Sequence, residues 1–323
     1  MAFCVLSETK GMDINMKEWL SGGIWPTMLT PFNMENDIDF NGVESLVKWY
    51  IKKKVSGLFA ICQSSEMFFL SLKERIELIQ CIKKVAGGKI PVIASGHISD
   101  SIKDQIYELN NMADTGIDAL ILISNRLAKK NEDDDVWIKN LNYIIKNLPE
   151  NIPLGIYECP FPYKRLLTDK LIKACDETKR FFFLKDTSCN LAILKKRAEL
   201  LKNSSFKIYN ANAATLLESL KFGISGYSGV MANFIPEFYI WLYNNYKKMP
   251  QKAREVSDYI GFCSVIESQC YPINAKYYLK LLGVKIDINS RVKDIKLFGS
   301  SNKIEIEQFK YFNQRMKKIF NIE

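Results

Sequence analysis

The chain has 323 residues, 47% of them hydrophobic, which fits one large α/β domain or a barrel with a small appendage. Its formal charge is +9, but the 45 basic side chains are spread over predicted helical segments, which does not indicate a nucleic-acid groove. No apolar run approaches the ~20 residues that span a bilayer, so we expect neither a nucleic acid nor a membrane as partner.

Cysteines and histidines limit the metal chemistry that this chain could support. The eight cysteines include no C-x-x-C pair, and the single histidine, His97, excludes a histidine-rich metal site. We therefore expect no metal site. Scattered cysteines suit a reducing compartment, and the first ten residues lack the basic start of a signal peptide, so we expect a cytoplasmic protein.

Apolar strands alternate with amphipathic helices after a short N-terminal extension, which we place at residues 1–20. Many strands are continuous apolar runs, as expected of parallel strands that are covered on both faces. The predicted strands are Gly23–Thr30, Gly57–Cys62, Pro91–Gly96, Ala119–Ser124, Pro153–Cys159, Phe181–Asp186, Phe206–Ala211 and Gly226–Val230. The helices that follow them are predicted over Asn41–Lys54, Ser71–Val85, Ser101–Asp114, Asp134–Asn147, Thr168–Glu177, Leu191–Lys202, Ala214–Phe222 and Pro236–Lys248.

Eight consecutive β/α units predict an α/β fold, a (β/α)8 TIM barrel over residues 21–248. A doubly wound sheet is the alternative, but no G-x-G-x-x-G follows the first strand, so nothing indicates dinucleotide binding. Ser71 and Glu74 form a capping-box pattern at one helix start, and Gly87 closes that helix. A C-terminal helical extension is predicted over residues 249–323, with helices at Gln251–Ser268, Asn274–Leu282 and Ile304–Phe320 and a loop near Arg291–Ser301.

Two reactive side chains lie at the ends of neighbouring strands, Tyr157 in the fifth and Lys185 in the sixth. In a (β/α)8 barrel these ends form the mouth where chemistry gathers. Strand alternation places Phe181 and Phe183 on the same face as Lys185, so we expect its amine above dry aromatic rings. Desolvation lowers the pKa of a lysine and frees a nucleophile for imine formation, while a nearby phenol can move protons. A lone lysine at a strand end is more often simply solvated.

Two other segments at the predicted mouth offer groups for binding a substrate. The turn Gln63-Ser64-Ser65 after the second strand carries hydroxyls and backbone N–H groups suited to a small carboxylate. Arg126 follows the fourth strand and is a candidate for a distal anionic group, because arginine binds carboxylates bidentately. Its alternative is a structural ion pair with an acid of Glu132–Asp135.

The remaining polar residues near strand ends are given structural roles. Glu158 should point away from the barrel interior and form an ion pair, and His97 should serve as a cap or hydrogen-bonding group. Cys62, Cys159 and Cys189 are interpreted as buried small hydrophobes, since no histidine neighbours them in sequence to activate a thiolate. We interpret Asn210, Asn212 and Asn233 as turn residues, whose side chains bond to the backbone nearby.

Five segments, spread from Gly23 to Gly283, resemble the dihydrodipicolinate synthase and N-acetylneuraminate lyase family of pyruvate-dependent class I aldolases. The first strand ends in Thr30-Pro31-Phe32, and the turn Gln63-Ser64-Ser65-Glu66 resembles the family's Gly-Thr-Thr-Gly-Glu. The other three are Tyr157-x-x-Pro160 with Lys185-Asp186-Thr187-Ser188, the glycine-rich stretch Gly223–Asn233, and the tail segment Pro272–Lys276.

The resemblance implies a Schiff-base-forming class I aldolase or lyase in which Lys185 condenses with pyruvate or a related 2-oxo acid. It implies that the carboxylate rests on Ser64 and backbone amides near Ser65, and that Tyr157 relays protons. Gln63 and Tyr227 are further substrate-binding candidates on the same basis, and no cofactor is needed. A homotetramer whose neighbouring subunits complete the site is the assembly that the family suggests.

The sequence departs from the family where a second substrate would bind. Pro162 replaces the arginine of the synthases, and Ile123–Ala128 lacks their tyrosine pair. Gln63 has no hydroxyl to pass a proton, and Asn210–Ala213 replaces the Gly-x-Asp-Glu of the neuraminate lyases. We therefore expect an unknown aldehyde, or its aldol product, as the second partner.

Three alternatives remain open at this point. The first is dihydrodipicolinate synthase itself, with Lys164, Arg165 or Arg126 replacing the missing arginine. The second is a sugar-acid dehydratase, since imine–enamine chemistry also expels β-hydroxyls. The third, from another class, is a non-catalytic 2-oxo-acid sensor, which the altered loops after the second, fourth and seventh strands would permit.

Overall fold

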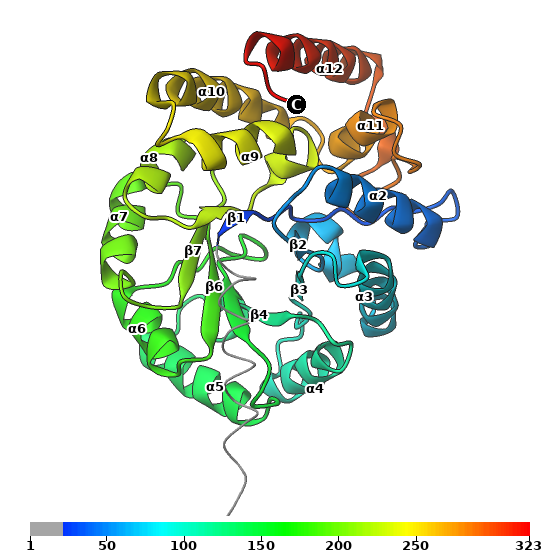
Figure 1. Cartoon of the computed structure of the whole chain (residues 1–323). Coiled ribbons are helices and arrows are strands. Elements are labelled where there is room, and N and C mark those ends of the chain that lie inside the picture. The colour runs from blue at the N-terminus through cyan, green and yellow to red at the C-terminus, as the bar shows by residue number, and fades with distance from the viewer. Residues whose placement is uncertain (1–21) are drawn as a thin grey trace, which may run out of the picture.

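A computed structural model describes residues 22–323, so the predicted extension at residues 1–20 lies outside the described part of the chain. Eight parallel strands follow one another in the order β1-β8-β7-β6-β5-β4-β3-β2. A parallel bridge between Thr27 and Phe59 joins the two ends of this order, and the Met28 N–H donates to the Phe59 carbonyl at 2.9 Å. The helices surround the strands (Figure 1), which confirms the (β/α)8 barrel.

The elements occur in the predicted order and close to the predicted positions. The strands are β1 (Gly23–Ile24), β2 (Leu58–Phe59), β3 (Val92–Ala94), β4 (Ala119–Ile123), β5 (Leu154–Tyr157), β6 (Phe181–Asp186), β7 (Lys207–Asn210) and β8 (Gly226–Tyr227). The barrel helices are α2 (Phe40–Lys52), α3 (Leu72–Ala86), α4 (Ile102–Ala113), α5 (Asp134–Lys146), α6 (Asp169–Glu177), α7 (Leu191–Leu200), α8 (Leu216–Lys221) and α9 (Pro236–Asn245).

Most strands are shorter than predicted, above all the first, which was expected to run to Thr30. Pro26 has no N–H for a strand ladder, and the chain beyond it pairs with β2 only around Thr27. Helix starts follow the sequence signals more closely. At α3 the Ser71 hydroxyl accepts from the Glu74 N–H, the Glu74 carboxylate accepts from the Ser71 N–H, and Gly87 ends the helix in the left-handed conformation.

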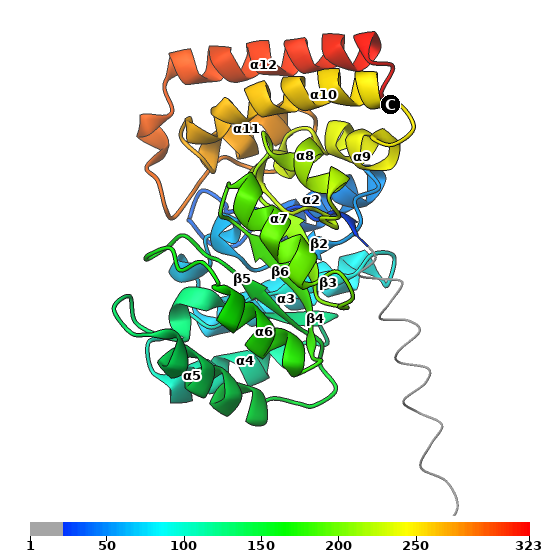
Figure 2. The same ribbon diagram turned by 90° about the vertical axis from the view of Figure 1, so that its left-hand side faces the viewer.

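The C-terminal helices lie on one side of the barrel, where α10 packs against α8 and α9 and α12 packs against α11 (Figure 2). They are α10 (Pro250–Cys263), α11 (Ile273–Leu281) and α12 (Ser300–Ile319), and the proposed boundary at residues 248–249 falls between α9 and α10. The predicted single helix over 251–268 is divided into α10 and a 3-10 turn, η5 (Ser264–Ser268). In residues 22–323 no helix has the length and apolar character needed to cross a membrane.

A buried ion pair fastens this helical extension to the barrel mouth. Lys276 of α11 contacts the Glu66 carboxylate at 2.7 Å, and both side chains are shielded from solvent. The same carboxylate accepts hydrogen bonds from the Ser290 hydroxyl at 2.9 Å and from the Arg291 N–H at 2.6 Å. The Lys276 ammonium also lies 4.7 Å from the centre of the Phe32 ring. These contacts hold the segment before α12 across the mouth.

Replacing Lys276 by Met is expected to lower the free energy of unfolding by about 3 kcal/mol, because Glu66 would be left as a buried charge without its cation. Lys280→Met is the matched control on the same helix. Its partner Asp287 lies 2.8 Å away, but about half of each side chain is exposed, so the loss should stay below about 1 kcal/mol. Urea denaturation of the two variants measures the difference, and equal losses would contradict the expectation.

Candidate active site

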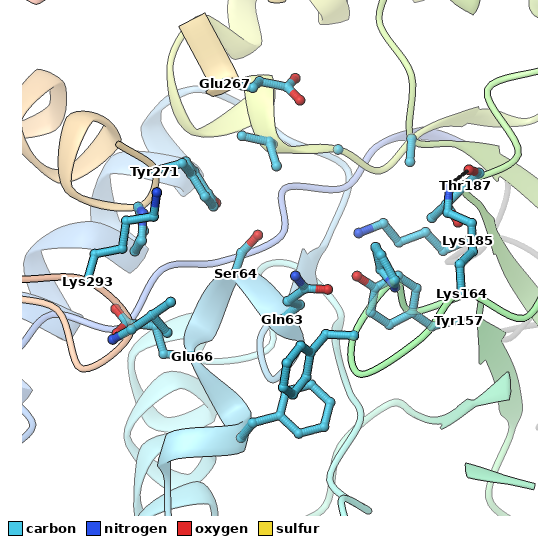
Figure 3. Close-up of a pocket in the computed structure, with 18 of the residues that line it drawn as sticks. Gln63, Ser64, Glu66, Tyr157, Lys164, Lys185, Thr187, Glu267, Tyr271 and Lys293 are labelled. Carbon is cyan, nitrogen blue, oxygen red and sulfur yellow. Dashed lines mark hydrogen bonds between the residues drawn. The ribbon is translucent and has the colours of Figure 1, made fainter. Parts of the chain in front are cut away.

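Lys185 and Tyr157 come together at the ends of two paired strands. The register of β5 and β6 places Tyr157 directly beside Lys185. The Lys185 ammonium lies 4.3 Å from the centre of the Tyr157 ring and 5.7 Å from that of Phe59, and only 5% of the residue is exposed. Both side chains point into the mouth of the barrel (Figure 3).

Aromatic rings from four strands or strand ends form the floor below these two residues. Phe183 stacks on Tyr209 with 4.3 Å between ring centres, and Trp25 and Phe59 pack edge-on against it at 5.6 and 6.0 Å. The expected dry aromatic environment of Lys185 is thus present, with Phe59 as the phenylalanine nearest to the amine. Phe181 packs instead on Phe206, below a register shift between β5 and β6.

Burial sets the protonation of both groups. It lowers the pKa of Lys185, and only the weaker influences of Cys62, Cys159 and Glu267 oppose that shift, so the neutral nucleophilic amine becomes more accessible. Burial also raises the pKa of the Tyr157 phenol well above its ordinary value. Tyr157 is therefore a phenol rather than a phenolate, able to donate a proton to a neighbouring oxygen or nitrogen.

The cysteines around the mouth do not behave alike. Burial raises the pKa of Cys62 and brings that of Cys159 to about 11, so both stay neutral thiols, as the prediction of small buried side chains requires. The prediction is wrong for Cys189, which is exposed and lines the cavity, because the chain turns outward there with a positive φ of 55°. In residues 22–323 no cluster of three His, Cys, Asp or Glu side chains could hold a metal ion.

A cavity of about 470 Å³ opens above Lys185. Its wall combines apolar rings with a small number of polar groups, which is the usual make-up of a small-molecule site. Phe68 and Phe161 meet edge-on at 4.9 Å on one side. The polar groups that line it are Gln63, Ser64, Glu66, Tyr157, Lys164, Lys185, Thr187, Glu267, Tyr271 and Lys293.

The turn after β2 presents one hydroxyl to this cavity. Ser64 lines it and donates to the Thr27 hydroxyl at 3.1 Å, and Gln63 lines it beside Cys159. Ser65 does not line it, because its hydroxyl donates to the Cys62 carbonyl at 2.7 Å and its N–H bonds to the same carbonyl at 3.2 Å. Within this turn Ser64 is therefore the better placed serine for a carboxylate.

The sequence interpretation missed three residues that the helical extension brings to the cavity, namely Glu267, Tyr271 and Lys293. The Tyr271 phenol faces the Ser64 hydroxyl and accepts from the Asn233 amide at 3.2 Å. Tyr271 precedes Pro272, the start of the tail segment that carried the family resemblance. That segment was the one signal that could have directed attention to it.

Two predicted substrate-binding residues lie elsewhere. Tyr227 is buried, stacks on Tyr239 at 4.3 Å between ring centres, and does not line the Lys185 cavity. Arg126 lines a neighbouring hollow and contacts Asp100 at 2.5 Å, so its ionic partner is not in the Glu132–Asp135 run. Its guanidinium packs 5.5 Å from the centre of the Phe68 ring, and a substrate in the Lys185 cavity would have to extend past that ring to meet it.

Among the three proposed substitutes for the missing arginine, Lys164 alone lines the Lys185 cavity. Its ammonium donates to the Thr187 carbonyl at 2.7 Å. Arg165 is turned away, with its guanidinium 3.2 Å from the Asp134 carboxylate. Any anionic group of a second substrate would therefore meet Lys164 or Lys293 first.

A buried network lies behind the reactive pair. Arg197 of α7 contacts the Glu158 carboxylate at 2.7 Å and also pairs with Asp186, and all three side chains are almost fully buried. Glu158 in turn accepts from the Thr187 N–H at 2.9 Å. The predicted ion pair of Glu158 is confirmed. Because Glu158 follows Tyr157 and Asp186 follows Lys185, the network fixes the two strand ends that carry the reactive pair.

His97, Asn210 and Asn212 have the structural roles that were predicted, but the turn interpretation is wrong for Asn233, whose amide donates to the Thr27 carbonyl at 2.9 Å while its oxygen accepts from the Tyr50 hydroxyl at 2.5 Å. His97 accepts from the Ile123 N–H at Nε2, 2.6 Å away, so its Nδ1 carries the proton donated to Gln105. Burial lowers the pKa of His97 to about 4, which keeps the ring neutral. Asn210 and Asn212 accept hydrogen bonds from backbone N–H groups in their own turn.

Comparisons with known proteins agree with this geometry. The model of the Dihydrodipicolinate synthetase family matches residues 20–292. The 4-hydroxy-tetrahydrodipicolinate synthase of Methanocaldococcus jannaschii is 24% identical over 265 residues, which cover 81% of this chain and 88% of that protein.

Two solved structures are similar in fold. A prophage protein of the dihydrodipicolinic acid synthase family from E. coli K12, in complex with pyruvate, has a TM-score of 0.82 at 18% identity over 91% of this chain and 98% of its own. CdNal of Clostridium difficile, in complex with mannosamine, has a TM-score of 0.79 at 20% identity over 89% of this chain and 98% of its own. The chain belongs to the dihydrodipicolinate synthetase family, whose members are lyases of the class I aldolase type.

Proposed function

We propose that this protein is a Schiff-base-forming lyase that acts on pyruvate or a related 2-oxo acid, with an unidentified aldehyde or its aldol product as second substrate. The observation that carries the proposal is the buried Lys185 amine, held 4.3 Å from the Tyr157 ring at the base of a cavity that Ser64 also lines. The pyruvate complex of the E. coli relative supports the choice of 2-oxo acid.

Formation of the imine needs no group beyond these residues. The neutral Lys185 amine adds to the keto carbon, Tyr157 supplies the proton that lets water leave, and the protonated imine draws electrons from the neighbouring carbon. Ser64, with Tyr271 beside it, would hold the carboxylate of the oxo acid. Loss of a proton from that neighbouring carbon gives an enamine, which can attack an aldehyde or form again when an aldol product is cleaved.

The test is the intact mass after incubation with pyruvate and borohydride, followed by peptide mapping. A reduced pyruvyl adduct on Lys185 supports the proposal, and an adduct formed only with a longer 2-oxo acid points to sugar-acid cleavage or dehydration. An adduct elsewhere, or none with any 2-oxo acid, overturns the proposal and favours the sensor. Turnover of aspartate semialdehyde in a coupled assay would identify the synthase alternative, with Lys164 in the place of the missing arginine.

Replacing Tyr157 by Phe is expected to slow adduct formation by about 10²–10⁴-fold, the usual contribution of a positioned acid–base group. Rapid quenching with borohydride measures this rate. Tyr143→Phe, which removes an exposed phenol, is the matched control and should leave it unchanged. A loss well below tenfold would remove Tyr157 from the mechanism.

We further propose a homotetramer in the cytoplasm. Free cysteines at all seven described positions support a reducing compartment. Exposed apolar side chains on the helical extension, Phe262 and Val265 among them, support burial of this surface against another subunit. Light scattering on the purified chain tests the assembly, and a monomeric mass would contradict it.

A further inference from the structure

Glu267 reaches the cavity from η5, the turn between α10 and α11. It lines the cavity together with Lys185, Tyr157 and Ser64. In the view of Figure 3 Glu267 lies above the line from Ser64 to Lys185, and Tyr157 lies below it. The mechanism above gives no role to this carboxyl, although it is a titratable group that faces the reacting centre.

The backbone that carries Glu267 is held in place by α11. Asn274 is fully buried, and its amide donates to the Ile266 carbonyl at 2.8 Å. The Gln269 N–H donates to the same carbonyl at 3.1 Å. Asn274 lies on the helix that Lys276 fastens to the barrel mouth. Glu267 is thus presented from a fixed turn, as a group that must meet a substrate atom requires.

The carboxyl is mostly buried but has no partner of its own. Within residues 22–323 it forms no hydrogen bond and no ion pair, not even with Lys185. Burial raises the pKa of Glu267 to about 7, and the positive charge of Lys185 opposes this only in part. Near neutral pH the group is divided between acid and base, the condition that suits proton transfer. A carboxyl kept only to balance the charge of Lys185 would be expected to pair with it.

We propose that Glu267 is the acid–base group that moves the proton between C3 of the Lys185 imine and the enamine, on the side of the cavity opposite Tyr157. This inference rests on the imine chemistry of the proposed function. The Glu267 carboxylate takes a proton from C3, and the electrons of that C–H bond form the C2–C3 double bond. The electron pair of the C2–N double bond moves to nitrogen, which gives a neutral enamine, and the reverse step returns the proton.

Four other polar groups in or beside the cavity suit this step less well. Burial raises the pKa of the Tyr157 phenol well above its ordinary value, so its basic form is scarce at neutral pH. The Cys159 thiol, which contacts Gln63 but does not line the cavity, has a pKa of about 11 and is also held in its acid form. Gln63 cannot exchange a proton in this range, and the Lys164 ammonium is engaged by the Thr187 carbonyl.

The test follows the exchange of pyruvate methyl protons for deuterium by NMR, which needs no second substrate. Glu267→Gln in the full chain should slow this exchange by about 10²–10⁴-fold, while borohydride still traps pyruvate on Lys185. Wild-type exchange should rise with pH through an apparent pKa near 7, and Glu267→Gln should lack this rise. Glu255→Gln, an exposed glutamate of α10, is the charge-matched control and should keep the wild-type rate. The Lys185→Arg variant, which lacks the imine-forming amine, gives the background rate of exchange.

Unchanged exchange in Glu267→Gln, with trapping intact, would overturn the inference. Loss of trapping in that variant would also overturn it, because the carboxyl would then be required for imine formation rather than for the C3 proton. The inference is also overturned if the wild-type protein traps pyruvate but exchanges its methyl protons no faster than the Lys185→Arg variant does. A wild-type protein that traps no 2-oxo acid refutes the proposed function instead, so the two failures are distinct. If only a longer 2-oxo acid is trapped, its C3 protons are followed in place of the methyl group.

Discussion

Replacing Lys185 by Met is expected to abolish the reaction while making the protein more stable. The amine is the proposed nucleophile, and removing a catalytic nucleophile costs about 10⁶-fold in kcat. Borohydride should therefore trap no 2-oxo acid on the Lys185→Met protein. Methionine fills a similar volume and leaves no charge between Tyr157 and Phe59, so the aromatic floor should remain packed.

The gain in stability follows from the direction of the pKa shift. Burial lowers the pKa of Lys185, so the unfolded chain binds this proton more tightly than the folded chain does. At neutral pH the buried ammonium therefore opposes folding, and we expect methionine to raise the free energy of unfolding by about 1 kcal/mol. The difference should shrink as the pH rises towards about 10.4, the ordinary lysine pKa, where both states lose the proton.

Lys207→Met is the matched control for this substitution. Lys207 begins β7, at the other end of the barrel strands, and its ammonium donates to the Ser204 carbonyl at 3.0 Å. That variant should keep trapping of 2-oxo acids and show no gain in stability. Turnover retained by Lys185→Met, or a Lys185→Met protein less stable than the wild type in urea, would contradict the expectation.

The sequence was sufficient to predict the barrel and the meeting of Tyr157 and Lys185 at its mouth, because both depend on strand ends. The parallel register of the fifth and sixth strands brings Tyr157 and Lys185 to one edge, and alternation along the sixth strand turns Phe183 inward beneath the amine. The substrate roles of Ser64 and Gln63 remain predictions, although both residues line the cavity. These predictions succeed for a local reason. The place of each residue at a strand end follows from the short apolar run before it and the point where that run stops.

Glu267 and Tyr271 could not be placed in the same way. Two helices, α9 and α10, separate them from the last barrel strand. No local sequence pattern shows how far the chain beyond these helices folds back over the mouth. Their position depends on a long-range ion pair, between Lys276 and Glu66, 210 residues apart. For Arg126 the local pattern was misleading. Its position after the fourth strand suggested that it faces the cavity, but its side chain turns to Asp100 instead.

Arg197→Met is expected to cause the largest loss of stability, about 5 kcal/mol, because it leaves both Glu158 and Asp186 buried without a cation. Burial alone would lower the pKa of Arg197, but the two carboxylates outweigh it and raise the pKa, so the guanidinium stays charged. Urea denaturation measures the loss. Arg254→Met is the control, since Arg254 pairs with Asp258 on the surface and its removal should cost below about 1 kcal/mol.

A triple variant separates two roles of this network. Arg197→Met combined with Glu158→Gln and Asp186→Asn removes all three charges, while each amide keeps an oxygen for the N–H group that bonds there. Replacement of a buried ion triad by apolar residues is often neutral for stability. We expect most of the lost stability to return. Trapping of pyruvate on Lys185 should nevertheless stay slower than in the wild type, because the charges also hold the ends of β5 and β6 in register. Wild-type trapping in the triple variant would show that packing alone positions the reactive pair.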